Sequence, residues 1–368
     1  MLNPPPPAVT QSLSVDDFAT HFQAKVAGIR SATASAPSPD IERRDVTPLS
    51  SFVPTTPKEI SDILRKAPPK HCNLDPIPTW LVKKAAPVLV PIISKLCNAS
   101  LSSGLLPNSQ KLATVRPLLK KPTLDPDELN SYRPISNLTF VSKTVERVVA
   151  ARFVNHVNNN HLLPDRQSAY RRFHSTETAI AAVHNDLVRA ADNDHVTALV
   201  LLDLSSAFDT VDHQILLSVL QQRFGIEELA LDWFRSYLSE RSQTFISGGK
   251  SSATFAVNCS VPQGSVLGPL EFISYTEDVA KIFEHHDLHH HLFADDKQAY
   301  NDTSLAEIDD LRKRLHDCTT DISRWCSSRR LQLNEAKTEL AWFGKRSRLT
   351  KLAESNNEVT VGADVIQP

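Results

Sequence analysis

Two adjacent carboxylates, Asp295 and Asp296, directly follow the apolar residues 292–294. Polar residues and a second apolar pair come next, which predicts a short hairpin with the acids at its turn. Because neighbouring side chains of a strand point to opposite faces, adjacent acids share one site only at a bend. Unpaired charges are costly to desolvate, and a divalent cation with hard oxygen ligands, Mg²⁺ or Mn²⁺, is one compensation. A solvated turn is the alternative for this pair alone.

A second apolar run, residues 198–202, ends at Asp203. It has the composition of a buried strand. Two buried strands that each end in a carboxylate can place these groups side by side at one end of a sheet. Phosphoryl transfer assisted by two metal ions requires this arrangement.

Composition sets bounds on the class of protein. The 368 residues are 41% hydrophobic and 22% charged, which is ordinary for a globular chain large enough for two or three subdomains. The formal net charge is −2, so any surface that binds nucleic acid must be local. No apolar run approaches the roughly 20 residues of a membrane span, so no membrane partner is expected.

Five cysteines occur without a C-x-x-C pair. This spacing argues against a disulfide framework or a zinc ribbon and favours a reducing compartment. We therefore expect an intracellular protein, in the cytoplasm, the nucleus or both.

The remaining chain alternates short elements with turn signals. Residues 1–50 are rich in proline, serine and alanine and are predicted to be a largely disordered linker, with at most one short helix over 15–29. The apolar periodicity predicts helices over 142–158, 175–193, 211–224, 229–238, 270–283 and 304–328. Strands are predicted over 111–121, 243–247, 253–259, 331–334 and 338–343, with a last hairpin over 358–366.

Three further stretches carry chemical possibilities. The loop 261–269 holds two of the nine glycines, which allow a close approach of backbone to a ligand. Residues 167–173 mix aromatic and basic side chains that suit stacking on bases, and the strand over 111–121 is basic and suits phosphate. The histidines at 285, 286 and 289–291 have the composition of a zinc site, although no cysteine accompanies them.

Taken in order, the segments YRPISNLTFVSKTVERVV, QSAYRRFHSTETAI, LVLLDLSSAFDTVDH, SVPQGSVLGP, FADD and LQLNEAKTEL form a recognisable set. This set closely resembles the reverse transcriptase domain of non-LTR (LINE-type) retrotransposons, the Jockey-like group in particular. The resemblance covers roughly residues 55–366 and implies an RNA-directed DNA polymerase.

The resemblance implies an α+β, right-hand polymerase fold in which an antiparallel palm sheet is backed by helices. Residues 51–175 would form a fingers-like region and 176–345 the palm with its motifs. Residues 346–368 would be a truncated connection towards the primer grip, and the thumb would be largely absent. Since the upstream endonuclease common in such elements is also absent, we expect the chain to be a fragment.

By the same resemblance, Asp203 with the carbonyl of Leu204, together with Asp295, would bind two Mg²⁺ or Mn²⁺ ions, and Asp296 would assist. Lys337 would approach the leaving pyrophosphate and donate a proton. The partners would be an RNA template, a DNA primer and dNTPs, and the oligomeric state is open.

The resemblance also implies a nucleotide site. Phe208 would be a steric gate against the ribose 2′-hydroxyl, and Gln263 and Gly264 would line the nucleotide pocket. Arg133 would hold the triphosphate, with Lys120 or Lys121 as a helper.

Some residues depart from the family pattern. Glu271 and Thr276 stand where apolar residues are usual, and Glu277 is polar in a region that tolerates it. Lys297 stands where a small polar residue is usual, and there it either competes for the carboxylates or points outward.

Three functions remain: a polymerase, a non-catalytic nucleic-acid-binding remnant, and a palm enzyme without a template, such as a cyclase. Arg133 and Gln263 argue against the last. The sequence does not separate the first two.

Overall fold

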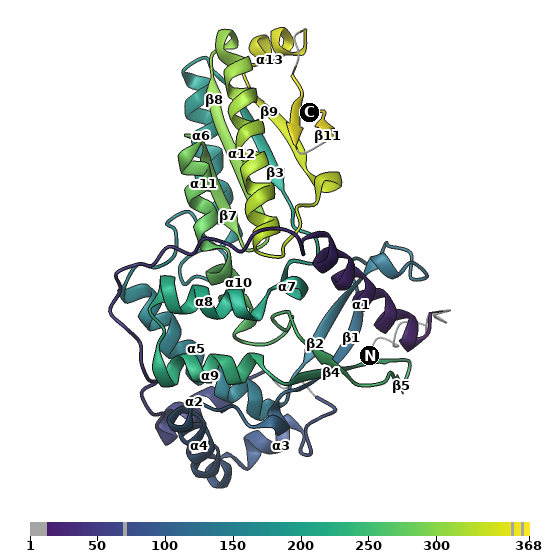
Figure 1. Ribbon diagram of the computed structural model, residues 1–368, viewed down its shortest axis with the longest axis vertical. Helices are drawn as coiled ribbons and strands as arrows, with labels where there is room; N and C mark the ends of the chain where they lie inside the picture. The colour runs from purple at the N-terminus through teal and green to yellow at the C-terminus, as the bar shows by residue number, and fades with distance from the viewer. Residues whose placement is uncertain (1–12, 69–71, 355–356, 362–363) are drawn as a thin grey trace, which may run out of the picture.

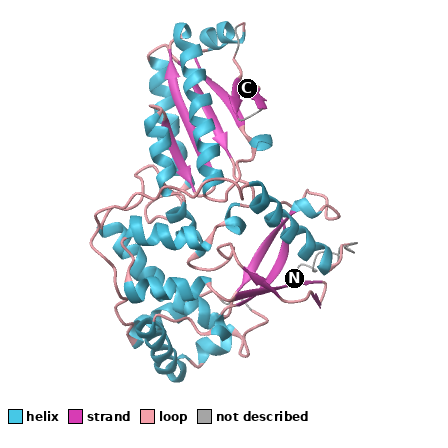
Figure 2. Ribbon diagram, in the orientation of Figure 1, coloured by secondary structure: helices cyan, strands magenta, loops and turns pink. Residues whose placement is uncertain are grey.

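The computed structural model describes residues 13–68, 72–354, 357–361 and 364–368. Two lobes are joined end to end (Figure 1). The upper lobe holds one antiparallel sheet with helices on it, and the lower lobe holds most of the helices and a second sheet (Figure 2). The upper sheet is antiparallel and is backed by helices, which is an α+β architecture.

The sheet of the upper lobe has the order β7-β8-β3-β9 and every pairing in it is antiparallel. Its strands are β7 (His289–Phe293), β8 (Asp296–Thr303), β3 (Val196–Leu202) and β9 (Glu339–Gly344). The central strand, β3, is apolar along almost its whole length because both of its faces are covered.

Side-chain alternation along β3 assigns the two faces of this sheet. Leu199 and Leu201 pack towards α6 (Thr176–Asp192), in a cluster with Val183 and Tyr300. The alternate β3 residues join the main core with α12 (Ile308–Ser328) on the opposite face. Residues of β8 follow the same alternation, so even-numbered positions such as Asp296 share the α6 face.

The second sheet has the order β2-β1-β4-β5, and β6 also pairs with β4. Its strands are β1 (Leu112–Leu119), β2 (Tyr132–Asn137), β4 (Arg241–Ser247), β5 (Lys250–Ser251) and β6 (Phe255–Val257). β1 runs antiparallel to β2 and parallel to β4, which brings two segments about a third of the chain apart side by side.

The other helices surround these sheets. They are α2 (Pro57–Lys66), α3 (Thr79–Lys84), α4 (Ala86–Ser103), α5 (Phe140–Asn159), α7 (Ala207–Thr210), α8 (His213–Phe224), α9 (Glu228–Leu238), α10 (Gly268–Tyr275), α11 (Ala280–His285) and α13 (Arg346–Ala353). Five 3₁₀ turns, Asn108–Gln110, Leu129–Ser131, Glu277–Val279, Leu305–Glu307 and Glu335–Lys337, connect them, and β10 (Val359–Val361) pairs with β11 (Asp364–Ile366). None of the helices in the described part of the chain has the length and apolar character of a membrane span.

Within the predicted linker over residues 1–50, the short helix predicted over 15–29 is present and slightly longer, whereas the other described residues of this segment are not a disordered linker. Ser14 begins α1 (Val15–Ala32) with a capping box to Asp17, and Phe18 packs edge-on against Tyr132 at 4.8 Å. The next segment is held in place by Arg44, whose backbone N–H donates to Gln222 O at 2.9 Å. Residues 1–12 lie outside the described residues. The composition misled because a proline-rich stretch lies on each side of an ordinary amphipathic helix.

Two acids that depart from the family pattern are buried in different ways. Glu277 accepts hydrogen bonds from the buried guanidinium of Arg223 and from Arg44 at 3.1 Å, so its charge is compensated. Glu271 is 0% exposed, and neither carboxyl oxygen has a hydrogen-bond partner among the described residues. Burial, and then the charge of Glu146, raise the pKa of Glu271 to about 8, against a smaller opposite effect of Arg241.

Glu271 should therefore lower the stability of the fold as pH rises. A carboxyl whose folded-state pKa is raised contributes most below its ordinary value of 4.5, and that contribution is lost as pH rises to about 8. We expect Glu271→Leu to raise the melting temperature at pH 8 and to raise it less at pH 5. At the higher pH, the free energy of unfolding should increase by roughly 1–4 kcal/mol. Thermal unfolding at both pH values measures this.

The exposed Glu284 of α11 provides the control. Glu284→Leu should leave the melting temperature and its pH dependence nearly unchanged. A Glu271→Leu protein that is less stable than the parent at pH 8 would contradict the buried, uncompensated state.

Candidate active site

The pairing of β3 with β8 brings the predicted acids together. The last pair joins Leu202 to Lys297, so one further step along the strands sets Asp203 opposite Asp296 on the α6 face. Directly opposed residues of antiparallel strands have Cβ atoms about 5 Å apart. Both carboxylates line a cavity of about 570 Å³.

The hairpin between β7 and β8 has a two-residue turn, Ala294 and Asp295, closed by the pair Phe293–Asp296. Ala294 has a φ of 58°, a left-handed conformation that residues other than glycine adopt infrequently. The predicted hairpin is confirmed, with Asp295 in the turn and Asp296 as the first residue of the returning strand. Strained backbone of this kind is frequent at functional sites.

The three acids influence one another electrostatically. Burial, and then the charges of Asp295 and Asp203, raise the pKa of Asp296. A local excess of negative charge of this kind favours a cation, and carboxylate and carbonyl oxygens are the ligands that Mg²⁺ and Mn²⁺ prefer. The donor chemistry therefore fits the predicted metals, although the described residues contain no group of three or more His, Cys, Asp or Glu side chains placed to hold a metal ion.

Lys337 forms an ion pair with Asp203. Its Nζ is 2.9 Å from Asp203 Oδ2, and Asn334 Nδ2 donates to the same oxygen at 3.1 Å. The backbone N–H of Asn334 also donates to Asp203 O at 2.9 Å. Asn334 was missed in the sequence because only the tertiary structure places it beside β3. Its position three residues before Lys337 is a signal that could have found it.

The backbone around Leu204 has the pairing of an antiparallel bridge to Leu333. The flanking hydrogen bonds run from Ser205 N to Gln332 O and from Asn334 N to Asp203 O. This bridge does not use the carbonyl of Leu204 itself, so that oxygen remains compatible with its predicted role as a ligand.

Lys297 does not point outward. It is 1% exposed, on the α12 face beneath the acids, and its Nζ lies 3.4 Å from Asp295 O. Burial lowers the pKa of Lys297, while the charges of neighbouring acids act in the opposite direction. The outward alternative is therefore wrong, and a buried amine lies where the family usually has a small side chain.

Gln263 and Gly264 lie in the loop before α10 and contact β2 and the segment that follows Asp203. Gln263 Nε2 donates to Asp209 Oδ2 at 3.1 Å, and Ser136 N donates to Gln263 O at 2.7 Å. Burial raises the pKa of Asp209 to about 7 against the Gln263 hydrogen bond. Asp209 was also missed. Its position in the sequence, one residue after Phe208, does not show that it is buried beside this loop.

Phe208 packs against Phe272 of α10 and is hydrogen-bonded to the loop before this helix. Its ring stacks on Phe272, with centroids 4.4 Å apart, and its carbonyl accepts a hydrogen bond from Val261 N at 2.9 Å. The ring therefore has a fixed support, and its role as a steric gate stays a prediction.

Lys120, which follows β1, lies close enough to Asp203 for their charges to interact. Lys120 Nζ donates to Asn130 O at 2.6 Å, and Arg133 is exposed on β2. Burial, and then the charges of Lys25, Lys337 and Arg133, lower the pKa of Lys120, whereas Asp203 acts to raise it. Lys25 of α1 was missed because the sequence does not show that the short helix predicted there packs on the second sheet. Lys121 is exposed in the bend after β1 and no contact supports its predicted role.

The histidine cluster is dispersed over different neighbours. His290 stacks on Phe283 at 5.1 Å, His291 Nε2 lies 2.9 Å from Ser168 Oγ, and His286 pairs with Asp321. Burial lowers the pKa of His290 to about 4. Alternation along β7 sends adjacent histidines to opposite faces, so the described structure does not support a zinc site.

An antiparallel sheet with acids at one end, beside basic strands of a second sheet, is consistent with the palm and fingers of a nucleic-acid polymerase. Residues 119–357 match the family described as reverse transcriptase (RNA-dependent DNA polymerase). The chain belongs to this family.

Three curated relatives from Drosophila melanogaster are similar to the chain. A probable RNA-directed DNA polymerase from transposon BS is 26% identical over 334 residues, 87% of this chain and 36% of the relative. The corresponding protein from the transposon X-element is 30% identical over 63% of this chain and 25% of the relative. The RNA-directed DNA polymerase from mobile element jockey is 27% identical over the same shares. The chain thus spans about a third or less of the length of these relatives.

Gly264 should be essential to the loop that carries Gln263. Its φ is +115°, and a Cβ there would lie 2.4 Å from Ser136 O. We expect Gly264→Ala to destabilise the protein by at least about 2 kcal/mol, because it combines backbone strain with displacement of the Ser136–Gln263 hydrogen bond. Urea unfolding measures the change.

Gly28, inside α1, is the matched control because a Cβ there would meet nothing within 4 Å. Gly28→Ala should be neutral or stabilising by about 0.5–1 kcal/mol. Equal stability of the two alanine variants would show that the loop tolerates a side chain at position 264.

Proposed function

We propose that the chain acts as an RNA-directed DNA polymerase that transfers dNTPs to a primer 3′-hydroxyl on an RNA template. The observation that carries this proposal is the register of β3 and β8, which sets Asp203 opposite Asp296 with Asp295 in the adjoining turn. Carboxylates that converge at one end of a sheet suit phosphoryl transfer with two divalent ions.

Asp203, Asp295 and Asp296, with the carbonyl of Leu204, would hold two Mg²⁺ or Mn²⁺ ions. When bound, these ions lower the pKa of the attacking hydroxyl and neutralise charge on the phosphates. Lys337 must first release the Asp203 carboxylate that it pairs with at 2.9 Å. Released, its ammonium would lie near the triphosphate and donate a proton to the leaving pyrophosphate.

The other groups position the substrates. Arg133 and Lys120 would bind triphosphate oxygens, because charge-assisted hydrogen bonds to phosphate are strong. Gln263 and Gly264 would form the wall of the nucleotide pocket, and Phe208 would exclude a ribose 2′-hydroxyl. Positioning and electrostatics supply most of the rate in reactions of this type.

The regional assignment follows the order of the family segments and not the two lobes, because β4, β5 and α7–α10 lie in the lower lobe beside the fingers segment (Figure 1). We assign residues 51–175 to fingers, 176–345 to palm and 346–368 to a connection towards a primer grip. Residues 13–50 join the fingers and palm through α1 rather than a linker. The described cysteines are all free thiols, which supports a reducing compartment such as the cytoplasm or the nucleus.

A second candidate function is a nucleic-acid-binding protein without catalysis. Lys297 beneath the acids and Lys337 on Asp203 favour it, because both cations occupy the surroundings of the metal ligands.

Primer extension on poly(rA)/oligo(dT) with Mg²⁺ or Mn²⁺ tests the proposal. We expect the parent chain to extend the primer and Asp295→Ala to lose at least about a hundredfold in rate, because a metal ligand is removed. Asp309→Asn, on an exposed part of α12 with 92% of its side chain accessible, should retain the parent rate.

Equal rates for the parent and Asp295→Ala would contradict the proposal that the chain is a polymerase. A parent chain that shifts RNA in a gel without extending a primer would favour the non-catalytic function.

A further inference from the structure

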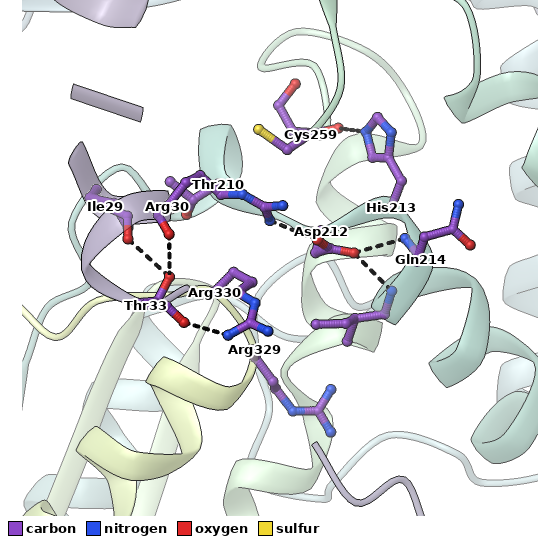
Figure 3. Close-up of polar contacts among 12 residues, drawn as sticks. Ile29, Arg30, Thr33, Thr210, Asp212, His213, Gln214, Cys259, Arg329 and Arg330 are labelled. Carbon is purple, nitrogen blue, oxygen red and sulfur yellow. Dashed lines mark hydrogen bonds and ion pairs between the residues drawn. The ribbon is translucent and has the colours of Figure 1, made fainter. Parts of the chain in front are cut away.

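The chain just before the loop 261–269 is fixed beside α8 (Figure 3). His213 Nε2, at the start of this helix, donates to Ser260 O at 2.8 Å. Asp212, the N-cap of the same helix, pairs with Arg30 of α1 at 2.7 Å. The loop therefore begins at a position that α8 and α1 determine together.

Within the loop, one side chain closes a tight turn. Ser265 Oγ donates to Pro262 O and accepts a hydrogen bond from Gly268 N, both at 2.8 Å. Gln263 is one of the residues of this turn, and it lines a cavity of about 340 Å³ to which α1 contributes another wall. The conformation of the turn therefore decides where the Gln263 side chain lies.

The far end of the loop is held by a side chain of α5. Glu146 Oε2 accepts hydrogen bonds from Val266 N at 2.6 Å and from Leu267 N at 3.3 Å. Ser142 Oγ donates to the other carboxyl oxygen of Glu146 at 3.2 Å. Leu267 is the N-cap of α10 and makes no side-chain cap there. Glu146 thus supplies, from a different helix, the carboxylate that stabilises a helix N-terminus.

This carboxylate is completely buried, which is unfavourable for a charged group. Burial raises the pKa of Glu146, whereas the charge of Arg241 and the hydrogen bonds that the carboxylate accepts act to lower it. The neighbouring Glu271 has no hydrogen-bond partner among the described residues, so a single negative charge shared by the two acids is favoured on Glu146. An apolar side chain at position 146 would avoid the desolvation, but it would leave the N–H groups of Val266 and Leu267 without this acceptor.

We propose that Glu146 is a positioning residue of the polymerase site, which fixes the loop 261–269 through the N–H groups of Val266 and Leu267 and so places Gln263. This inference rests on the proposed function, because Gln263 is assigned there to the nucleotide pocket. Glu146 acts only through the loop, and no contact with a substrate is required of it. A residue that merely stabilised the fold would change the amount of folded protein and not the affinity for a nucleotide.

Hydrogen exchange measures this attachment without any activity. Glu146→Leu removes the acceptor, so the amides of Val266 and Leu267 should exchange at least about tenfold faster. Glu146→Gln keeps an oxygen that can accept in place of Oε2, and its exchange should match the parent. Glu59→Leu is the matched control, because Glu59 pairs with Arg152 of the same helix instead of contacting the loop. It should leave the exchange of both amides unchanged.

The kinetics of primer extension separate positioning from stability. We expect Glu146→Leu to raise the KM for dNTP about tenfold and to change kcat less than about twofold, because the wall of the nucleotide pocket is misplaced. Glu146→Gln should restore the KM of the parent. Glu59→Leu should retain that KM even where its melting temperature falls, since unfolded protein lowers the apparent kcat and leaves KM unchanged.

Three results would overturn the inference. They are parent-like exchange of both amides in Glu146→Leu, a fall in kcat of this variant at unchanged KM, and a Glu146→Gln protein that behaves as Glu146→Leu does. Circular dichroism and melting temperatures show whether each variant is folded. If Glu146→Leu does not fold, Glu146→Asp replaces it, because its carboxylate is one methylene shorter and withdraws from the loop. An unchanged KM in a folded Glu146→Asp protein would equally contradict the positioning role.

The parent protein distinguishes this inference from the polymerase proposal. If the parent extends a primer and Glu146→Leu has the same KM, the positioning role fails and the polymerase stands. If the parent does not extend, a labelled dTTP is titrated with Mn²⁺ and poly(rA)/oligo(dT). About tenfold weaker binding by Glu146→Leu than by the parent and Glu146→Gln would then retain the role of Glu146 at a nucleotide site. Equal binding, or none, would remove both proposals.

Discussion

The antiparallel register between β3 and β8 is the constraint on which the site depends. A shift of one residue would send Asp296 to the α12 face and replace it in the cleft by a buried lysine. The register is enforced by the two different faces of the sheet, because Leu199 and Tyr300 pack under α6 while Val200 and Ala299 enter the main core. Apolar packing over the length of the strands thus decides where the carboxylates lie at their ends.

Lys297 shows that this constraint also has a cost. Its neighbours in β8 fix it on the core face, where an ammonium is poorly solvated, and its Nζ donates a hydrogen bond to the backbone carbonyl of Asp295 at 3.4 Å. The negative charges above it offset part of that cost. Glu271 has no hydrogen-bond partner among the described residues and only a weak opposing charge from Arg241, whereas Glu277 pairs with two arginines. Three polar departures from one family pattern therefore have three different energetic consequences.

The N-terminal helix connects the two lobes. Without α1, the face of the second sheet that holds Tyr132 and Phe245 would lose its apolar cover, and the cavity beside Gln263 would lose a wall. Its anchors, Arg30 on Asp212 and Arg330 on Thr33, involve segments roughly 180 and 300 residues away in the chain. Packing of the second sheet and the shape of the cavity beside Gln263 therefore depend on the same element.

Local patterns in the sequence determined much of this protein. Alternation and apolar runs located β3, the β7–β8 hairpin, α12 and the last hairpin, and the ordered motifs assigned the chain to its family. Tertiary structure alone decided which groups meet: Asn334 and Lys337 on Asp203, Asp209 on Gln263, Lys297 beneath the acids, and α1 over the second sheet. The physical reason is that periodicity within a segment records whether a face is buried, but not which distant segment covers it. The sequence of α1 thus predicts a short helix, but it does not show that strands more than a hundred residues away cover the apolar face of that helix.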